Sequence, residues 1–419
     1  MHSSTHRRQT RTLLTLLVCA MVVSFFDRGN LAVAAPVLAP ELGLSPWQLG
    51  LLLSAFFWTY AGCQIAAGWL SDHVEVRWVY AGGFILWSGT TLSTALVASF
   101  SGLLAMRLVL GVGESITYPA TSRVLAVVFP EERRGLANSL VDLGARLGPA
   151  LGTMCGALLV ARVGWRGLFV VTGTAALVWL GPWFAYAPRK LAEVAPVAPR
   201  GPKGDGGVGW RELLRHKAVW GTCGGLCGAN YAWYFLLSWL PSYLVSERHF
   251  SLKSMAFWGS MPYLCMAVSS LGGGILADHW IARGGSPVRV RRGFLVTGLA
   301  LTAVLLPAVL IPRIEWALGA LFLSCFTFGI YASNLFSLTQ TLAGPEAAGR
   351  WTGVQNACGN LAGIVSPAVT GSFIDATGHF SVAFLAASMA CLLGAASFGL
   401  LVRDSGYASR KWFTAEIRH

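Results

Sequence analysis

Long apolar stretches dominate this sequence and limit the folds that it can adopt. A helix needs roughly 20 mostly apolar residues to cross about 30 Å of hydrocarbon. Twelve stretches meet this requirement: 13–38, 47–70, 79–99, 101–128, 136–161, 164–188, 218–245, 254–278, 293–312, 315–342, 351–374 and 380–402. A soluble protein with 55% hydrophobic and only 12% charged residues would expose apolar surface everywhere. The sequence therefore predicts an all-α membrane protein with twelve transmembrane helices.

The stretches are expected to be helices because they are long and lack the alternating pattern of a β-strand. A spanning helix also satisfies its own backbone hydrogen bonds, which lipid cannot do. The basic N-terminus followed by an apolar run resembles a signal peptide. The run continues through Asp27 and Arg28 without a small-residue cleavage site, so we interpret it as the first span.

The excess of basic residues (formal net charge +13) is placed as expected for a membrane protein, not for one that binds nucleic acid. If residue 1 is cytoplasmic, the inner loops and tail carry most of the Lys and Arg: Arg77, Arg133, Arg134, the 189–217 loop, Arg283 to Arg292, Arg350, Arg403, Arg410, Lys411 and Arg418. The outer loops carry few. This positive-inside pattern predicts that both termini are cytoplasmic, in a bacterial inner membrane.

Cysteine usage gives no sign of a metal or disulfide site. All nine cysteines fall inside predicted spans, and no zinc-type spacing is present. The sequence also shows no Ser/His/Asp order and no phosphate-binding loop. We therefore expect neither an enzyme nor a protein with a cofactor.

A polar segment, 189–217, separates six spans from six. It is rich in Pro, Gly and basic residues, a composition typical of flexible linkers. The predicted organisation is a first six-helix bundle, a cytoplasmic linker, a second six-helix bundle and a cytoplasmic tail, with the bounds 1–188, 189–217, 218–403 and 404–419.

The two halves share a short repeat after their second predicted span. Gly68-Trp69-Leu70-Ser71-Asp72, followed by Arg77, recurs as Gly274-Ile275-Leu276-Ala277-Asp278, followed by Arg283. Duplicated halves joined by a long connection are typical of transporters whose substrate site lies between the halves.

This repeated loop resembles the signature loop of the major facilitator superfamily, and Arg107-x-x-x-Gly111-x-Gly113 resembles its second motif. Within the superfamily, the sequence resembles the anion:cation symporter family, which includes hexuronate, galactonate, glucarate and phthalate transporters. The matching segments are Asp27-Arg28, Ala34 to Pro36, Phe56 to Tyr60, Arg107 to Glu114, Tyr118 to Ala120, Asn230-Tyr231, Tyr234-Phe235, Trp239 to Pro241, Tyr243-Leu244, Asn356, Gly359 to Gly363 and Pro367.

Ionisable residues inside the spans are the main functional candidates. They are all in the first half: Asp27, Arg28, Arg107, Glu114, Arg123, Asp142 and Arg146. Each charge at the bilayer centre costs about 2.5–3.5 kcal/mol, so these groups are expected to face one another or a hydrated cavity. Such a set suits a carrier in which cations bind an anion and carboxylates carry the compensating proton.

Asp27 and Glu114 are the predicted proton-coupling residues. The resemblance implies this role for acids at these two positions. Burial opposes ionisation of a carboxyl group and a nearby guanidinium favours it, so hydration or substrate binding can change the balance. The alternative for Asp27 is a fixed ion pair that only holds helices together.

Arg28 is predicted to bind the substrate carboxylate, for which its planar guanidinium is well suited. It projects about 100° away from Asp27 around the helix, so their adjacency does not imply a salt bridge. Arg107 is expected to modulate Glu114, to bind the anion, or to act structurally. Arg146 either contacts substrate or pairs with Asp142 four residues earlier.

Neutral polar residues complete the predicted substrate site, because hydroxyl and amide groups can bind substrate hydroxyls. The candidates are Tyr60, Gln64, Asn230, Tyr231, Tyr234, Asn334, Asn356 and Asn360. Where related first helices often carry a Tyr shortly before the Asp, this chain has Phe25 and Phe26. A hydroxyl contact is missing there, so the substrates of the sugar-acid members are not carried over to this chain.

Asp72, Arg77, Asp278 and Arg283 are predicted to form an inner gate outside the substrate path. We interpret the sequence as that of a monomeric, proton-coupled symporter that imports a small organic anion (a sugar acid, dicarboxylate or aromatic carboxylate) by alternating access. Its expected partners are that anion, protons and the lipid bilayer, without nucleic acid. The alternatives are an organic-anion exchanger of the same fold and a non-transporting, receptor-like membrane protein.

Overall fold

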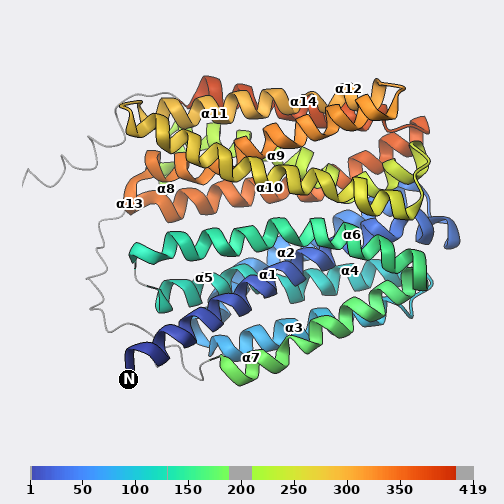
Figure 1. Cartoon of the computed structure of the whole chain (residues 1–419), viewed down its shortest axis with the longest axis horizontal. Helices are drawn as coiled ribbons and strands as arrows, with labels where there is room; N and C mark the ends of the chain where they lie inside the picture. Colours follow the sequence, from blue (N-terminus) through green and yellow to red (C-terminus); the bar gives the residue numbers. More distant parts are fainter. Residues whose placement is uncertain (1, 130, 188–209, 403–419) are drawn as a thin grey trace, which may run out of the picture. The chain divides into compact units, whose positions relative to one another are not determined.

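The computed structural model describes residues 2–129, 131–187 and 210–402, and all regular secondary structure within them is helical (Figure 1). The helices of the first half are α1 (His2–Glu41), α2 (Pro46–His73), α3 (Val76–Thr94), α4 (Phe100–Glu114), α5 (Thr117–Val128), α6 (Glu131–Val178) and α7 (Leu180–Tyr186). Those that follow are α8 (Trp210–Arg215), α9 (Lys217–Ser242) with a π-helical end (Tyr243–Glu247), α10 (Leu252–Ala282), α11 (Pro287–Thr302), α12 (Leu305–Leu310), α13 (Ile314–Thr377) and α14 (Ser381–Leu401).

Each predicted span coincides with helix, which confirms the predicted fold class. Within the described part of the chain, nine helical stretches are long and apolar enough to cross a bilayer. One of them, Ala137–Tyr186, has 50 residues. At about 1.5 Å per residue it would be far longer than one crossing requires. It bends at Gly164 (φ 72°, ψ 174°), where the sequence places the boundary between two spans.

α13 is interrupted in the same way at Gly344, whose backbone also has a positive φ (65°). Glycine tolerates this left-handed conformation because it has no Cβ. Each of the two glycines therefore ends one helix and allows the next to start almost at once.

Local start signals fix several helix ends. Ser45 accepts a hydrogen bond from the Gln48 amide, and the Gln48 side chain accepts one from the Ser45 amide, forming a capping box before α2. Ser286 similarly caps α11. In both cases Pro occupies the first helical position, where its missing N–H costs nothing. Each such cap contributes about 1 kcal/mol.

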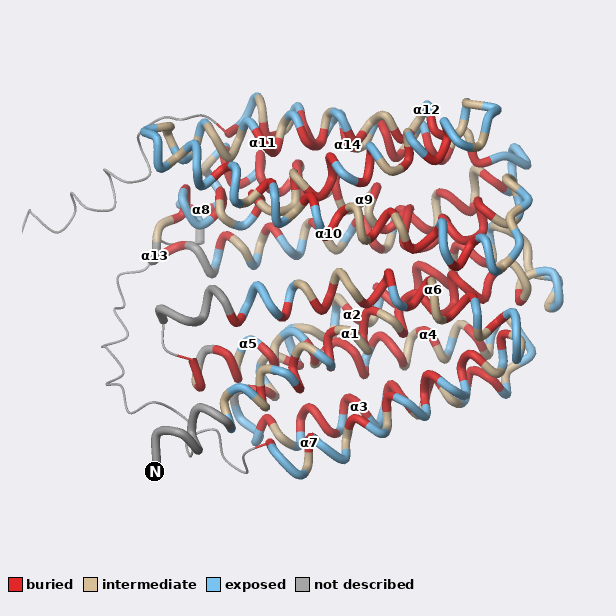
Figure 2. The backbone as a smooth tube through the Cα atoms, viewed as in Figure 1, coloured by how far each residue is buried: buried red, intermediate tan, exposed pale blue. Residues whose placement is uncertain are grey.

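Surface exposure matches a bilayer environment. Figure 2 shows buried residues along one side of many helices and exposed residues along the other. Large aliphatic side chains are found on the exposed sides, as with Ile65 (85% exposed), Leu400 (70%) and Ile275 (72%). Exposed apolar surface of this kind is disfavoured in water. The exposed apolar side chains are therefore expected to face lipid.

Contacts divide the chain into two compact units. The first consists of Met1–Pro199, Leu237–Tyr263 and Pro367–Ala376, and the second of Arg200–Leu236, Leu264–Ser366 and Thr377–His419. The linker prediction falls largely on 188–209 and the tail prediction on 403–419, both outside the described residues. The domain boundaries proposed from the sequence stay a prediction.

The sequence repeat has a counterpart in the packing inside each unit. Tyr80 on α3 hydrogen-bonds to the Thr121 hydroxyl and to a backbone carbonyl four residues earlier. Arg291 on α11 donates to the Thr341 hydroxyl and also to the carbonyl four residues earlier, at 3.0 and 2.8 Å. A phenol and a guanidinium therefore make the same helix-to-helix connection in the two halves.

The packing of α2 against α4 depends on Gly111. A Cβ at this position would lie 2.3 Å from the Phe56 carbonyl oxygen and 2.3 Å from the Thr59 hydroxyl oxygen. Thr59 donates to the Leu108 carbonyl at 2.7 Å in the same contact. The two helix backbones approach closely because no side chain separates them.

Gly111→Ala is expected to destabilise the first unit by about 1–3 kcal/mol, since the added methyl group forces α2 and α4 apart. The matched control is Gly89→Ala, because nothing lies within 4 Å of a Cβ there. Thermal unfolding of the purified proteins, followed by fluorescence, should show a lower Tm for the first variant only. Equal Tm values for both variants would refute the packing argument.

Candidate functional site

Four charged residues of the first half are buried inside the first unit. Their exposed fractions are 3% for Asp27, 7% for Arg28, 6% for Arg107 and 0% for Glu114. Asp27 and Arg28 are on α1, whereas Arg107 and Glu114 are on α4. Of the seven ionisable residues predicted inside the spans, these four are buried, whereas Arg123 and Arg146 are half-buried and Asp142 is exposed.

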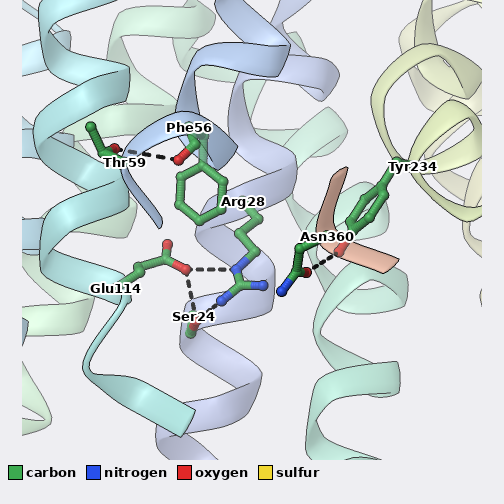
Figure 3. Close-up of polar contacts among 7 residues, drawn as sticks. All are labelled: Ser24, Arg28, Phe56, Thr59, Glu114, Tyr234 and Asn360. Carbon is green, nitrogen blue, oxygen red and sulfur yellow. Dashed lines mark hydrogen bonds and ion pairs between the residues drawn. The ribbon is translucent and has the colours of Figure 1, made fainter. Parts of the chain in front are cut away.

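Arg28 pairs with Glu114 across α1 and α4. Its Nε donates to Glu114 Oε2 at 2.7 Å, and the Ser24 hydroxyl donates to the same oxygen at 2.8 Å (Figure 3). Ser24 is one helical turn before Arg28 and also lies 3.5 Å from Arg28 Nη2. Glu114 Oε1 is buried without a hydrogen-bond partner among the described residues. The pair uses one carboxylate oxygen and is not the two-pronged arrangement that holds Arg most tightly.

Aromatic rings surround the Arg28 guanidinium. Its Cζ lies 4.4 Å from the ring centroids of both Phe25 and Tyr60 and 5.2 Å from that of Phe56. A cation over a ring face is attracted to it, and more strongly when water is excluded. The rings therefore hold the guanidinium in place even if its bond to Glu114 breaks. Phe25 stands where related first helices often carry a Tyr hydroxyl, and here its ring forms one side of the aromatic surroundings of Arg28.

Asp27 faces a different set of groups. Its Oδ1 accepts a hydrogen bond from Asn30 Nδ2 at 2.8 Å, and its Oδ2 has no hydrogen bond of ordinary length to a described residue. Asp27 is therefore not fixed in an ion pair with Arg28. The expectation that adjacency on a helix would not produce a salt bridge agrees with this geometry.

Arg107 is held by the backbone of α2. Its Nε donates to the Leu52 carbonyl at 3.2 Å, and its Cζ lies 5.3 Å from the Phe56 ring centroid. It interacts electrostatically with both Glu114 and Asp27 without a direct salt bridge to either. This placement favours a modulating role over direct contact with substrate.

Helix α4 ends at Glu114, and α5 begins at Thr117. The two helices nevertheless form one apolar span, Phe100–Leu125, where the sequence predicts one, and the linking residues Ser115 and Ile116 keep right-handed helical backbone angles. Pro119 explains the break, because it has no N–H for the carbonyl of Ser115 and its ring collides with that carbonyl. Broken helices often place backbone groups beside intramembrane sites. The proton-coupling candidate is thus the last residue before the break.

On α2, Tyr60 is buried against Arg28 and Gln64 is half-buried one turn later. The structure therefore places Tyr60 beside the charged cluster, and its predicted role in substrate binding stays a prediction. Gln64 is on the same side of α2 because residues four apart share a helix face.

The neutral candidates of the second half join α9 to α13 within the second unit. Tyr234 Oη donates to Asn360 Oδ1 at 3.3 Å (Figure 3), and Asn230 Nδ2 donates to the Gly359 carbonyl at 3.1 Å. The Tyr231 carbonyl accepts from Ser366 at 2.8 Å. These bonds fasten the two helices together, and a substrate-binding role for these residues stays a prediction.

Two other polar candidates of that half differ in burial. Asn356 is exposed, whereas Asn334 is buried and donates to the Ile330 carbonyl at 3.3 Å. Of these two residues, only Asn356 has an exposed side-chain amide.

Arg146 pairs with Asp142 at 2.9 Å, four residues apart on α6. Asp142 is exposed and Arg146 is half-buried. The pairing that the sequence left open is therefore present. Exposed pairs of this kind contribute only about 0.3–0.5 kcal/mol, so Arg146 stays available to a ligand.

The predicted gate residues have partners other than one another. Arg77 donates to the Phe184 carbonyl at 2.6 Å, and Asp278 pairs with Arg291 at 3.5 Å. Arg283 is exposed at the end of α10, and the side chain of Asp72 lies outside the described residues. Asp278 is thus joined to a later Arg than the repeat suggests, and the gate role stays a prediction.

Ser24, Asn30 and Arg291 are polar contacts that the sequence reasoning missed. Helical spacing was an available signal for the first two, since Ser24 is four residues before Arg28 and Asn30 three after Asp27. Arg291 could not be chosen from among the basic residues of its loop by spacing alone.

The comparisons with known proteins agree on one family. The sequence profile described as the Major Facilitator Superfamily matches residues 17–367. The chain is 32% identical over 394 residues to the probable sulfoacetate transporter SauU of Cupriavidus necator, covering 90% of this chain and 91% of the relative. It is 29% identical over 418 residues to the D-galactonate transporter of Escherichia coli O6:H1, covering 95% and 96%.

The fold has solved counterparts. A bacterial homologue of the human lysosomal transporter Spinster, in an inward-facing and occupied conformation, superposes with a TM-score of 0.80 at 18% identity, covering 93% of this chain and 96% of the other. The helical architecture, the repeated loop and the matched profile therefore agree. The chain belongs to the major facilitator superfamily, where its relatives include transporters of organic anions.

Proposed function

We propose that the protein is a proton-coupled symporter that imports a small organic anion. The observation that carries this proposal is the buried bond from Arg28 to Glu114, with Ser24 on the same carboxylate oxygen. A proton on Glu114 removes the charge that holds Arg28. The freed guanidinium then has a binding capacity that an anionic substrate group can use.

The proposed cycle begins with proton uptake by Glu114 and Asp27 from the outer side. Arg28 then exchanges the Glu114 carboxylate for a carboxylate or sulfonate of the substrate, while the aromatic rings keep the guanidinium in place. After the cavity opens to the cytoplasm, loss of the proton restores the Glu114 anion. It competes for Arg28 and displaces the substrate, so the proton gradient drives uptake.

The substrate class follows from the same groups. One buried guanidinium suits a compact anionic group, and Arg146 offers a second cation for a larger or doubly charged anion. The names of relatives include sulfoacetate and D-galactonate, both small organic anions. The inner-membrane location, cytoplasmic termini and monomeric action belong to the same proposal.

Uptake into proteoliposomes tests the proposal. A panel of radiolabelled D-galactonate, D-glucarate, sulfoacetate and phthalate is offered with and without an imposed gradient, alkaline inside. Symport predicts accumulation of at least one compound only with the gradient. Uptake that depends on preloaded anion and not on the gradient would instead indicate an exchanger, and no uptake of any compound would contradict transport of this class.

A further inference from the structure

A second polar cluster lies on the side of α1 that carries Asp27. Asp27 and Asn30, three residues apart, are 3% and 1% exposed. The amide nitrogen of Asn30 donates to Asp27 Oδ1 at 2.8 Å and to Thr172 Oγ1 at 3.0 Å. One NH2 group thus connects a carboxyl group on α1 to a hydroxyl on α6.

Thr172 fixes the orientation of that amide. Its own hydroxyl donates to the Leu168 carbonyl at 2.9 Å. The Thr172 oxygen can therefore only accept from Asn30, so Asn30 must present nitrogen and not oxygen. Asn30 Oδ1 is correspondingly buried with no hydrogen-bond partner among the described residues.

The other residues around Asp27 are closely packed, and none of them forms a hydrogen bond of ordinary length with its carboxyl group. Trp87 of α3 approaches Asp27 and interacts with it, yet its Nε1 makes no hydrogen bond of ordinary length to a described residue. A Cβ on Gly173 would lie 3.0 Å from the Ser88 carbonyl, so α3 and α6 are in close contact there. The charged groups that face Asp27 are Glu114 and Arg107, both on α4.

The two protonation states of Asp27 differ in the hydrogen bonds that they can form. An ionised carboxylate only accepts hydrogen bonds, whereas the protonated acid has an O–H to donate and keeps one oxygen that accepts. With the proton on Oδ2, Asn30 can still donate to Oδ1. The hydrogen bond from Asn30 is stronger when Asp27 is ionised, because its acceptor then carries a charge.

We infer that Asn30 and Thr172 are positioning residues that stabilise the ionised form of Asp27. Thr172 donates to the Leu168 carbonyl and accepts from Asn30, which keeps the amide nitrogen of Asn30 directed at Asp27 Oδ1. The cluster therefore holds a hydrogen-bond donor against the carboxylate, and losing either residue should favour the protonated acid.

The role of this positioning in transport rests on the proposed function, but its chemistry can be tested without substrate. Infrared difference titration of the full-length protein in nanodiscs detects protonated carboxyl groups directly. The band that is lost in Asp27→Asn is assigned to Asp27. Its midpoint is the pH at which half of the band has disappeared.

Asn30→Leu is expected to move this midpoint to higher pH by about one unit or more, because the ionised carboxylate loses a charge-assisted hydrogen bond. Thr172→Val should move it in the same direction by about half a unit to one unit, since one neutral hydrogen bond no longer favours the ionised state. Thr172→Ser keeps the hydroxyl and should restore the wild-type midpoint.

The matched control is Thr94→Val. Thr94 is as buried as Thr172 and donates to a carbonyl of its own helix at 2.8 Å. An unchanged midpoint in Asn30→Leu and Thr172→Val, or an equal shift in Thr94→Val, would overturn the positioning role of Asn30 and Thr172. Its failure is separable from failure of the proposed function, which is judged by gradient-driven uptake in Asp27→Asn. If no infrared band depends on Asp27, its carboxyl group does not titrate in the accessible range. That result would refute both its positioning by Asn30 and Thr172 and its part in the proposed proton coupling.

Discussion

Arg28→Lys is expected to reduce the initial rate of anion uptake roughly 100-fold or more. Lysine keeps the charge but has no planar fork for a carboxylate or sulfonate. It also cannot stack in the same way on Phe25 and Tyr60, whose centroids lie 4.4 Å from the guanidinium. Losing a charged hydrogen bond worth about 3 kcal/mol corresponds to about two orders of magnitude.

The control for this prediction is Arg146→Lys. Arg146 is half-buried and pairs with an exposed aspartate on its own helix, so the same substitution should change the rate only a few-fold. Initial rates in proteoliposomes, normalised to the amount of inserted protein, provide the comparison. Wild-type uptake by Arg28→Lys would remove this arginine from the substrate site. An equal loss in both variants would show that lysine is poorly tolerated in this protein generally.

Glu114→Gln is expected to abolish gradient-driven accumulation while retaining exchange of labelled for unlabelled anion. Glutamine resembles the protonated acid in shape and keeps an oxygen that can accept from Ser24, which donates to Glu114 at 2.8 Å. It carries no charge to recapture Arg28. Substrate binding should therefore depend less on pH, with only Asp27 still able to take up a proton, and the gradient should no longer release Arg28 from a carboxylate to drive accumulation.

Glu41→Gln is the matched control for this second prediction. Glu41 is also a glutamate paired with an arginine, Arg166, but both side chains are nearly half exposed at a helix end. Removing that charge should leave accumulation unchanged within about two-fold. Accumulation by Glu114→Gln to the wild-type level, or its loss in Glu41→Gln as well, would be incompatible with the assigned role of Glu114.

The spans, the superfamily and the buried charges of the first half are predictable from the sequence because each rests on hydrophobicity or on charge in a membrane. The pairing of those charges is not. Arg28 and Arg107 both lie at a depth from which they can reach an acid, and helix rotation decides between them. In the structure Arg28 donates to Glu114, whereas Arg107 donates to the Leu52 carbonyl.

The break in the fourth predicted span shows a different limit. Pro119 was visible in the sequence, but a mostly apolar window does not indicate whether a proline bends a helix or divides it. Here α4 ends at Glu114 and α5 starts at Thr117, although the apolar span Phe100–Leu125 continues through this point with helical backbone angles. Similarly, Asp278 pairs with Arg291, because the loop between their helices, and not the repeat, sets the distance.

The central claim, that a proton on the buried acids exchanges for an anion on Arg28, is tested most directly by calorimetry. Binding of a transported anion is measured in buffers with different ionisation enthalpies, which gives the number of protons taken up per anion bound. At a pH where Glu114 is ionised in the free protein, we expect proton uptake with the wild type and less uptake with Glu114→Gln. Anion binding without any proton uptake by the wild type, or with undiminished uptake by Glu114→Gln, would contradict the exchange.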